Sequence, residues 1–402
     1  MKVKIFPSRP FGEITAPPSK SMAHRLLICA AMAKGESRIC GVSHCDDVLA
    51  TIECLSTLGA KFKRDGEDIT VSGIDILSAT PEGDLFCRES GSTLRMLIPM
   101  ATLSGGQVLF GAKEGLLRRP MTVYEKLYSE RGLLFAQSES GFRVKGALTA
   151  GEYTLPGDIS SQFISGLIFA LAALDGESTV HITPPFESRS YVEMTLEALR
   201  YFSAEAYFTD SCTVKIAGGG YKCCDAVVEG DYSGAAFPEA LNLLGGEVTL
   251  LGLSDSSRQG DRIYREYFEK LRLGTPTLDI GNCPDLGPVL FALAAALNGA
   301  TFTGTARLKI KESDRAAAMA EELAKLGGRV HIYENSVTVE KASLTAPTEP
   351  ILSHGDHRIV MAMAILLTLT GGEIEGASAV DKSYPHFFRD LKKLNINLEI
   401  YD

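Results

Sequence analysis

The hydrophobic positions of this 402-residue chain fall into six similar segments. Each segment opens with a short polar cluster, continues as an apolar run long enough for a helix, breaks at glycine and ends in alternating, strand-like positions. The first reads SKSMAHRLLICAAMAKGESRICG and the last reads DHRIVMAMAILLTLTGGEIEG. The segments start near residues 19, 90, 160, 232, 285 and 356, so the steps are 70 to 72 residues except for the fourth, which is 53. This repetition predicts six copies of one structural unit, with a break in regularity near residues 230–260.

A second type of helix follows several of the apolar runs. The stretches VEMTLEALRYF, RAAAMAEELAKLGG and FFRDLKKLN carry apolar residues at every third or fourth position, which is typical of a helix with one buried face. Each unit is therefore expected to combine a helix buried on all sides, an amphipathic helix and short strands. Three such units could share one core through their buried helices. We therefore predict two domains of an α/β (α+β) fold.

Composition and charge narrow the range of possible functions. The chain is 45% hydrophobic and 22% charged, as in ordinary globular proteins, and its 40 Lys and Arg against 50 Asp and Glu give a net charge of −10. An acidic chain is a poor general binder of nucleic acid, because phosphate backbones favour net positive surfaces. The longest uncharged stretches, such as 359–372, are shorter than the about 20 residues of a membrane-spanning helix. The first ten residues lack the apolar core of a signal peptide, so we expect a cytoplasmic protein with no nucleic-acid or membrane partner.

Cysteine usage gives no sign of a metal site. None of the nine cysteines forms a Cys-x-x-Cys pair, and several lie inside apolar runs. Reduced thiols in the cytosol fit this pattern better than a zinc site or a disulfide framework.

The polar residues at the starts of the apolar runs suggest a ligand. Lys20, His24 and Arg25 stand at the beginning of a stretch that carries no charge from Leu26 to Ala33. A helix N-terminus carries about half a positive charge, so cations placed there are unfavourable unless an anion joins them. Helix starts that face a shared hollow would therefore concentrate positive potential for anionic ligands.

Eight separated motifs connect these helix starts with a known family. They are PPSKSMAHR, SGSTLR, LRRP, DISSQF, PDLGP, KESDR, GDHR and DKSYP, and they occur in this order. With them the chain resembles the EPSP synthases, the 3-phosphoshikimate 1-carboxyvinyltransferases, along essentially its whole length. The resemblance implies two domains, each of three βαβαββ units packed around buried helices as an inverse α/β barrel. Residues 1–18 and 231–402 should form one domain and residues 19–230 an inserted one, with the active site in the cleft between them.

The resemblance also implies a reaction of the shikimate pathway. The 5-hydroxyl of shikimate 3-phosphate attacks C2 of phosphoenolpyruvate, and the tetrahedral adduct loses phosphate. No organic cofactor or metal takes part, and the partners are the two small substrates of a monomeric enzyme.

Shikimate 3-phosphate carries a phosphate and a carboxylate, which call for cationic and short polar side chains. The resemblance places Arg25 on the carboxylate and Ser160 and Ser161 on the 3-phosphate. Arg189 and Ser190 stand after Ser188 where the family often has Lys and Pro. The implied ligands of shikimate 3-phosphate are Lys20, Ser21, Arg25, Ser160, Ser161, Gln162, Ser188, Asp285 and Lys311.

Phosphoenolpyruvate is expected to bind where a glycine leaves room for it. Gly91 matches the position at which a side chain would crowd this ligand. Glu89 and Ser90 precede it where the family has Asn-Ala or Asn-Ser, and Ser92 follows it where the family has Thr. Arg95 either shapes this segment or contacts the ligand. The implied ligands of phosphoenolpyruvate are Lys20, Gly91, Arg119, Gln162, Arg315, Arg358 and Lys382.

The resemblance assigns the proton chemistry to four residues. Asp285 corresponds to the base for the 5-hydroxyl, and Glu312 to the carboxyl group near the methylene carbon of phosphoenolpyruvate. A carboxylate among cations normally stays ionised, so either Lys20 or the substrate must supply the proton of Glu312. His357 is expected to act as a proton relay or a hydrogen-bond donor.

Two alternatives remain beside this interpretation. UDP-N-acetylglucosamine enolpyruvyl transferases share the repeats, but they usually open with Ser-Lys-Asn and carry a cysteine in the loop before an Arg-Pro pair. Here the triplet is Ser-Lys-Ser, and the loop GAKEGLLRRP has no cysteine. A catalytically silent protein that binds phosphorylated metabolites would need the anion contacts, but it would leave Lys20, Asp285 and Glu312 unexplained.

Overall fold

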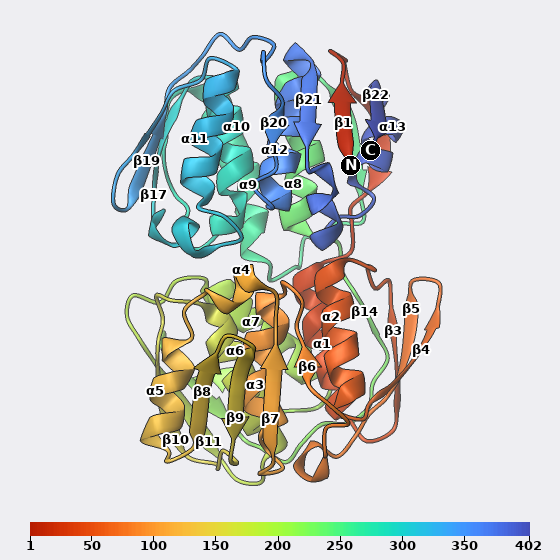
Figure 1. The fold of residues 1–402 in the computed structure, drawn as a ribbon, viewed down its shortest axis with the longest axis vertical. Helices are drawn as coiled ribbons and strands as arrows, with labels where there is room; N and C mark the ends of the chain where they lie inside the picture. Colours follow the sequence, from red (N-terminus) through yellow and green to blue (C-terminus); the bar gives the residue numbers. More distant parts are fainter. The chain divides into compact units, whose positions relative to one another are not determined.

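A computed structural model describes residues 1–402 and divides into two compact units (Figure 1). The inserted unit is the continuous segment Lys20–Glu229, and the terminal unit combines Met1–Ser19 with Gly230–Asp402. Each unit has its own hydrophobic core, and no buried apolar residue belongs to both.

The inserted unit contains three copies of the predicted repeat. Its helices are α1 (Lys20–Met32), α2 (Asp46–Thr57), α3 (Gly91–Ala101), α4 (Glu114–Leu117), α5 (Thr122–Glu130), α6 (Ser161–Ala173) and α7 (Arg189–Tyr201), with a 3₁₀ turn η1 (Ile76–Ser78). Its strands are β3 (Glu36–Cys40), β4 (Lys61–Asp65), β5 (Asp68–Ser72), β6 (Leu85–Phe86), β7 (Gln107–Gly111), β8 (Leu134–Ser138), β9 (Gly141–Lys145), β10 (Glu152–Pro156), β11 (Ser178–Thr183), β12 (Ala206–Phe208), β13 (Thr213–Ile216) and β14 (Ala226–Val227).

The terminal unit repeats the same plan with one shorter copy. Its helices are α8 (Tyr232–Ala240), α9 (Tyr264–Leu273), α10 (Gly287–Ala296), α11 (Arg315–Lys325), α12 (His357–Thr370) and α13 (Phe387–Lys393), with 3₁₀ turns η2 (Leu241–Leu244), η3 (Gly260–Ile263), η4 (Pro284–Leu286), η5 (Ala306–Ile310) and η6 (Ala377–Lys382). Its strands are β1 (Lys2–Ile5), β2 (Phe11–Thr15), β15 (Glu247–Leu251), β16 (Thr277–Asp279), β17 (Ala300–Thr303), β18 (Val330–Ile332), β19 (Ser336–Val339), β20 (Ile351–Leu352), β21 (Gly372–Glu375) and β22 (Leu398–Tyr401).

Five of the six sheets share one topology. The four-stranded sheets run β14-β3-β5-β4, β6-β7-β9-β8 and β10-β11-β13-β12 in the inserted unit, and β16-β17-β19-β18 and β20-β21-β1-β22 in the terminal unit. In each, the first pair is parallel and the other two pairs are antiparallel. The sixth sheet has only the parallel pair β15-β2. This short sheet belongs to the fourth repeat, whose shorter step in the sequence is thereby explained.

The first strand of the chain completes a sheet made mostly from its last residues. β1 lies between β21 and β22, so that Val3 is opposite both Ile374 and Ile400. The inserted unit closes in a similar way, because β14 pairs with β3 at the other end of that segment. The predicted mixed α/β fold of two domains built from repeated units is confirmed.

The apolar runs form helices that are buried on nearly all sides. Every residue of α1 from Met22 onward is buried, as are all residues of α10 from Gly287 to Ala295. Such helices have no polar face and therefore lie inside a domain. In contrast, α7 and α11 alternate buried and exposed positions, as the sequence predicts for amphipathic helices.

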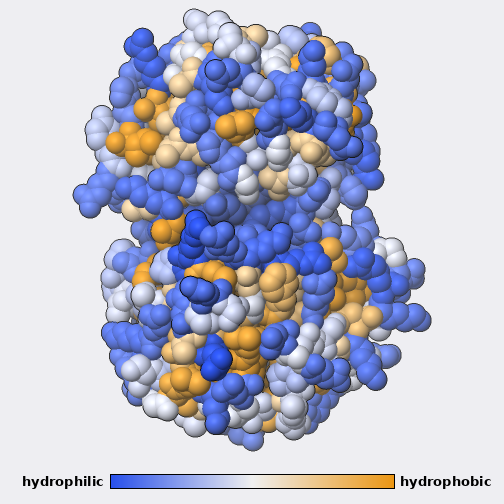
Figure 2. Space-filling model, in the orientation of Figure 1, coloured by the Kyte–Doolittle hydropathy of each residue, from blue (hydrophilic) through white to orange (hydrophobic).

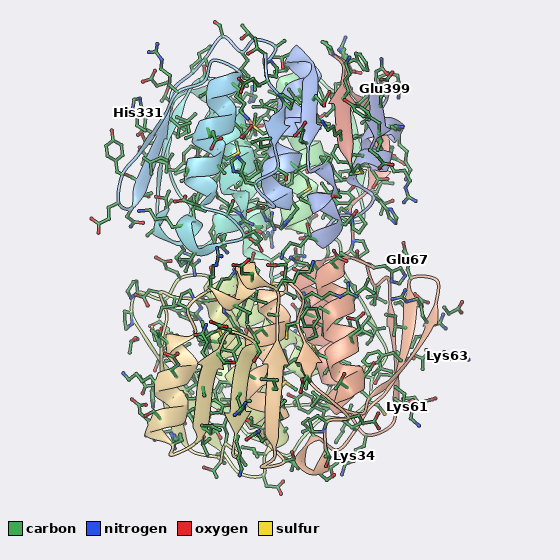
Figure 3. All side chains as sticks on the ribbon, viewed as in Figure 1. Lys34, Lys61, Lys63, Glu67, His331 and Glu399 are labelled. Carbon is green, nitrogen blue, oxygen red and sulfur yellow. The ribbon has the colours of Figure 1, made fainter.

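Charged side chains lie mainly on the outside, as the cost of burying an unpaired charge requires. Figure 2 shows one face on which hydrophilic residues predominate and apolar residues form small patches. Figure 3 labels six exposed examples at the periphery of the two units: Lys34, Lys61, Lys63, Glu67, His331 and Glu399. The buried charges are therefore exceptional, and several of them, such as Asp47, Arg315 and Asp356, lie at helix starts. None of the helices has both the length and the apolar composition that a membrane-spanning helix needs.

Candidate active site

The first helix of the inserted unit begins with an ion pair. Lys20 opens α1, and its ammonium lies 2.8 Å from Oδ2 of Asp47 in the first turn of α2. The two side chains are 14% and 5% exposed. A lysine at a helix start is unfavourable on its own, and the Asp47 carboxylate provides the compensating charge.

Arg25 lies one turn further along α1 and is held only by neutral groups. Its Nε donates to Thr195 Oγ1 at 2.9 Å, Nη1 to the carbonyl of Ser21 at 2.7 Å and Nη2 to the carbonyl of Tyr191 at 2.9 Å. The side chain is 1% exposed, and this burial lowers the pKa of Arg25 to about 10. No carboxylate forms an ion pair with it, so a buried positive charge and two further N–H groups are available to an anion.

A chain of buried hydroxyl groups connects the first three helices. His24 Nδ1 lies 2.7 Å from Thr51 Oγ1, which lies 2.7 Å from Thr93 Oγ1. Thr93 Oγ1 donates to Ser90 Oγ at 2.7 Å, and Ser90 also accepts the backbone N–H of Thr93 as the N-cap of α3. All four side chains are at most 1% exposed. Burial lowers the pKa of His24 to about 3, so this histidine is neutral at physiological pH.

Two of the predicted ligands of phosphoenolpyruvate, Arg119 and Gln162, lie beside a third, Gly91. A Cβ atom at this first residue of α3 would lie 3.2 Å from Arg119 Nη1, 3.3 Å from Arg95 Nη1 and 3.6 Å from Gln162 Oε1. Gln162 is fixed between two neighbours, because its Oε1 accepts from Arg95 Nη1 at 2.9 Å and its Nε2 donates to Ser92 Oγ at 2.9 Å. The Arg95 guanidinium thus shapes this segment through Gln162.

Three of the serines expected to bind shikimate 3-phosphate lie at two other helix starts. Ser160 is the N-cap of α6, and its Oγ accepts from the backbone N–H of Gln162 at 3.3 Å. Ser161 opens the helix, is 6% exposed, and its hydroxyl makes no hydrogen bond within the protein. Ser188 precedes α7 in the left-handed conformation, with φ of 56°, which is strained for a residue other than glycine. These hydroxyl groups and α-helix N-termini suit a phosphate.

The terminal unit gathers a second set of charged residues around Asp285, just before α10. Asp285 Oδ1 lies 2.7 Å from Arg315 Nη1 and 3.2 Å from Lys311 Nζ, and Oδ2 lies 3.2 Å from Arg358 Nη2. Arg358 Nη1 also donates to the backbone carbonyl of Asp285 at 3.0 Å. Burial alone would raise the pKa of Asp285, but Arg358, Lys311 and Arg315 together hold this pKa well below its usual range.

Arg315 is the centre of this set and contacts three carboxylates. Besides Asp285, it donates from Nη2 to Glu312 at 2.8 Å and from Nε to Asp356 at 2.8 Å. Its side chain is 1% exposed, and these carboxylates raise the pKa of Arg315 against the opposing effect of burial. Lys382 Nζ lies 3.9 Å from the other oxygen of Glu312. The terminal unit therefore brings together Asp285, Lys311, Glu312, Arg315, Arg358 and Lys382, all of which the sequence had predicted as site residues.

His357 follows a buried acid at the start of α12. Asp356 caps this helix by accepting from the backbone N–H of Arg358 at 2.9 Å. His357 is 1% exposed, and its Nδ1 lies 3.6 Å from Asp356 Oδ1. The structure thus places His357 inside the protein beside the acid that also holds Arg315.

From the sequence we expect bound anions to compensate the crowded cations, and in the structure carboxylates of the protein pair with several of these cations. Lys20, Arg315, Arg358 and Lys311 are already paired with carboxylates of the protein itself. Substrate anions would therefore have to replace these carboxylates rather than fill an uncompensated site. Among the predicted cations of α1 and of the terminal unit, Arg25 is the one that has no carboxylate partner.

Three polar residues that the motifs do not include lie beside the predicted ones. Asp47 pairs with Lys20, and Thr195 holds Arg25. Asp261 is 2% exposed, and burial together with neighbouring Asp285 raises the pKa of Asp261 to about 6. Asp47 and Thr195 lie on amphipathic helices, in whose sequence a polar residue with a structural role cannot be distinguished from a solvent-exposed one. The only signal for Asp47 was its place in the first turn of a helix that follows a polar cluster.

One group of side chains has the composition of a metal site. Potential ligand atoms of Glu321, Glu322 and His354 lie within 4.8 Å of one another. The Glu322 carboxylate already accepts from Lys325 Nζ, from His354 Nε2 at 2.7 Å and from the backbone N–H of Leu352 at 2.9 Å. These hydrogen bonds account for the group as part of the packing of α11 against β20.

Comparison with known proteins agrees with the motifs. The model of one family, EPSP synthase (3-phosphoshikimate 1-carboxyvinyltransferase), matches residues 7–391. A 3-phosphoshikimate 1-carboxyvinyltransferase of Clostridium beijerinckii is 37% identical over 421 residues, covering 98% of this chain and 97% of that protein. The protein of the same name from Clostridioides difficile is 35% identical, with the same coverage of both chains. The solved structure of an EPSP synthase from Acinetobacter baumannii has the same fold, with a TM-score of 0.80, 22% identity and full coverage of both chains.

Proposed function

Because the chain belongs to the EPSP synthase family, we propose that it transfers the enolpyruvyl group of phosphoenolpyruvate to the 5-hydroxyl of shikimate 3-phosphate and releases phosphate. The reaction belongs to the shikimate pathway of aromatic amino acid biosynthesis. The family match over residues 7–391 is the observation that carries this conclusion. The roles of individual residues below are part of the proposal.

The reaction has an addition step and an elimination step. In the addition, the 5-oxygen forms a bond with C2 of phosphoenolpyruvate, the hydroxyl proton leaves to a base, and the methylene carbon gains a proton to become a methyl group. In the elimination, the bond between C2 and the phosphate oxygen breaks, and the methyl group returns a proton to restore the double bond. The protein must therefore supply a base, an acid and cations for the phosphate and carboxylate groups.

Residues of the inserted unit are proposed to bind the substrates. Arg25 suits the carboxylate of shikimate 3-phosphate, because its charge has no carboxylate partner in the protein. Ser160, Ser161 and Ser188 offer hydroxyl groups at helix starts to the 3-phosphate. The remaining proposed ligands in this unit are Lys20 and Gln162 for both substrates, Ser21 for shikimate 3-phosphate, and Gly91 and Arg119 for phosphoenolpyruvate.

Residues of the terminal unit are proposed to carry the proton chemistry. Asp285 is the base for the 5-hydroxyl, but its three cationic partners make it a weak base as long as they remain paired with it. Substrate anions that bind Arg315, Arg358 and Lys311 would withdraw these cations from Asp285 and raise its basicity. Glu312 is the proposed acid for the methylene carbon, His357 is the proposed relay, and Lys382 completes the cations for phosphoenolpyruvate.

The proposal requires residues of both units to act on one pair of substrates. The enzyme is proposed to work as a cytoplasmic monomer, with these two small molecules and no nucleic acid as its partners. No cofactor is assigned a step.

The assignment of Asp285 is tested by phosphate release from mixed phosphoenolpyruvate and shikimate 3-phosphate. Asp285→Ala is expected to lower kcat by a factor of about 10² to 10⁴, the usual contribution of a general base. Asp255→Asn is the matched control, since Asp255 is 92% exposed in the same unit and should leave kcat unchanged. Equal rates for the parent and Asp285→Ala would exclude Asp285 as the base. No phosphate release by the parent would favour a silent binding protein.

A further inference from the structure

His24 is buried beside the proposed site, and the reaction gives it no task. It lies one helical turn after Lys20 on α1, and its partner Thr51 lies one turn after Asp47 on α2. Residues four apart lie on the same face of a helix. The His24–Thr51 contact of 2.7 Å therefore repeats, one turn deeper, the bridge that Lys20 and Asp47 make between the same two helices.

The contact between His24 and Thr51 joins α1 to α2 in either ring tautomer, because a threonine hydroxyl can donate or accept. Thr51 Oγ1 lies 2.7 Å from Thr93 Oγ1, which donates to Ser90 Oγ at 2.7 Å. Both threonine hydroxyls also reach the backbone carbonyl of Asp47, at 3.5 Å and 3.4 Å. The Nε2 atom of His24 is buried without a hydrogen-bond partner, so the contact at Nδ1 is the hydrogen bond that holds this ring.

The chain of hydrogen bonds ends at the turn that carries Gly91. Ser90 Oγ receives the Thr93 hydroxyl at 2.7 Å and the Thr93 backbone N–H at 3.3 Å. Ser90 immediately precedes Gly91, beside which the guanidinium groups of Arg119 and Arg95 lie. The position of this turn is thus set by hydrogen bonds that start on α1 and cross α2.

We propose that His24 is a positioning residue for phosphoenolpyruvate. Through Thr51 and Thr93 it holds Ser90 and the first turn of α3, so that Gly91 keeps its distance from Arg119 and Gln162. This role rests on the proposed function, in which those three residues bind phosphoenolpyruvate. It assigns no contact between His24 and either substrate.

Two threonines on the same helix provide a matched test. Thr93 and Thr102 are both fully buried, and each hydroxyl has a buried hydroxyl partner, Thr102 Oγ1 lying 2.9 Å from Tyr128 OH at the far end of α3. Replacing Thr93 by valine removes its hydrogen bonds with Thr51 and Ser90, and replacing Thr102 by valine removes the one with Tyr128, at nearly constant shape in either case. Loss of a hydrogen bond that positions a ligand corresponds to about a tenfold loss of affinity.

Thr93→Val is expected to raise the KM for phosphoenolpyruvate about tenfold while the KM for shikimate 3-phosphate stays within about twofold. Thr102→Val should leave both constants within about twofold, although both variants lower the melting temperature to a similar extent. A general loss of structure would instead raise the KM for both substrates together, or raise the KM for phosphoenolpyruvate equally in Thr93→Val and Thr102→Val. Either of those results, or an unchanged KM for phosphoenolpyruvate in Thr93→Val, overturns the inference.

A second pair of variants tests His24 itself. Asparagine at position 24 can place an amide group, which donates or accepts, near the site of Nδ1, whereas leucine cannot. His24→Asn should therefore recover most of the phosphoenolpyruvate affinity that His24→Leu loses, and equal losses would contradict the positioning role. A parent protein that releases no phosphate would overturn the proposed function and with it this role, whereas an active parent with unaffected variants would overturn the inference alone.

Discussion

Two fully buried arginines show opposite ways of placing a charge inside this protein. Arg25 is surrounded by neutral acceptors, and burial lowers its pKa to about 10. Arg315 is bonded to three carboxylates, which raise its pKa despite burial. An anion that approaches Arg25 meets an uncompensated charge, whereas one that approaches Arg315 must first compete with the protein's own carboxylates. At the residue scale, Arg25 is therefore suited to binding an anion directly, and Arg315 to exchanging a carboxylate of the protein for an anion of the substrate.

Arg25→Lys keeps the charge but loses the fork of donors that reaches Thr195, Tyr191 and Ser21. One ammonium cannot hold these acceptors and a carboxylate together, so the KM for shikimate 3-phosphate is expected to rise at least about tenfold. The KM for phosphoenolpyruvate should change much less. Steady-state kinetics with each substrate varied in turn measures both, and Arg200→Lys on the exposed face of α7 is the control. Equal increases in the two constants would contradict a specific role of Arg25.

His24 also predicts how stability depends on pH. The folded pKa is about 3, whereas an unfolded histidine has a pKa of about 6.5, so between these values only the unfolded chain binds the proton. The free energy of unfolding should therefore fall as the pH drops below about 6.5, by about 1.4 kcal/mol per pH unit from this residue. Urea unfolding at pH 7.5 and 5 should show a smaller loss in His24→Asn than in the parent, by about 2 kcal/mol.

The same urea experiment with His331→Asn distinguishes the effect of a buried histidine on acid stability from the effect of losing any histidine, because His331 lies exposed on β18. If His331→Asn reduced the acid loss as much as His24→Asn, the buried position of His24 would not be the cause.

At the scale of elements, the sequence predicted the helices better than the pairing of the strands. The uncharged run from Leu26 to Ala33 is buried throughout, because a helix without a polar face has no stable position at the surface. The amphipathic pattern of α7 and α11 was likewise enough to predict one buried face. The spacing of apolar residues along a helix depends on which of its faces are buried. It therefore predicted the buried faces of these helices correctly.

Pairing over long distances in the chain leaves no local signal. Nothing in residues 2–5 indicates that β1 lies between β21 and β22, and only the family resemblance placed this segment with the end of the chain. The candidate site divides in the same way. Motif residues such as Asp285 and Arg315 could be predicted, whereas their network depends on tertiary contacts that no spacing encodes. Thr51 and Thr93, 42 residues apart, illustrate how such a contact remains hidden until the fold is known.

The start of α3 allows a prediction for an element that serves a ligand. In Gly91→Ala the new Cβ would lie 3.2 Å from Arg119 Nη1 and 3.3 Å from Arg95 Nη1, the far ends of two flexible side chains. Both can move aside at little cost in stability, and alanine favours a helix over glycine by about 1 kcal/mol. The melting temperature should therefore stay level or rise slightly, while the KM for phosphoenolpyruvate rises about tenfold as the guanidinium groups shift.

Gly106→Ala is the control for this prediction. Gly106 lies beyond the other end of α3, and its Cβ would meet only Ser104 Oγ at 3.7 Å, an ordinary contact. Kinetic constants like those of the parent are expected. A loss of stability in Gly91→Ala without a change in KM would show that the convergence of side chains on Gly91 serves packing alone.

At the scale of the whole molecule, the chain is one continuous unit inserted into a discontinuous one. Lys20–Glu229 contains all strands of its three sheets and a complete hydrophobic core. The terminal unit depends on residues 1–19, because β1 is an inner strand of one sheet and β2 is half of another. The hydrophobic residues Val3, Ile5 and Ile14 from this segment belong to its core.

This asymmetry predicts different behaviour for the two units when they are separated. Residues 20–229 expressed alone should unfold in one cooperative transition, because every strand keeps its partners. Residues 230–402 alone lose the strand between β21 and β22 and the partner of β15, which exposes sheet edges and removes core side chains. They should show no cooperative transition, and linking residues 1–19 to them through a flexible Gly-Ser segment should restore one. Circular dichroism during urea unfolding measures all three, and cooperative unfolding of residues 230–402 without the added segment would show that β1 and β2 are dispensable for the terminal core.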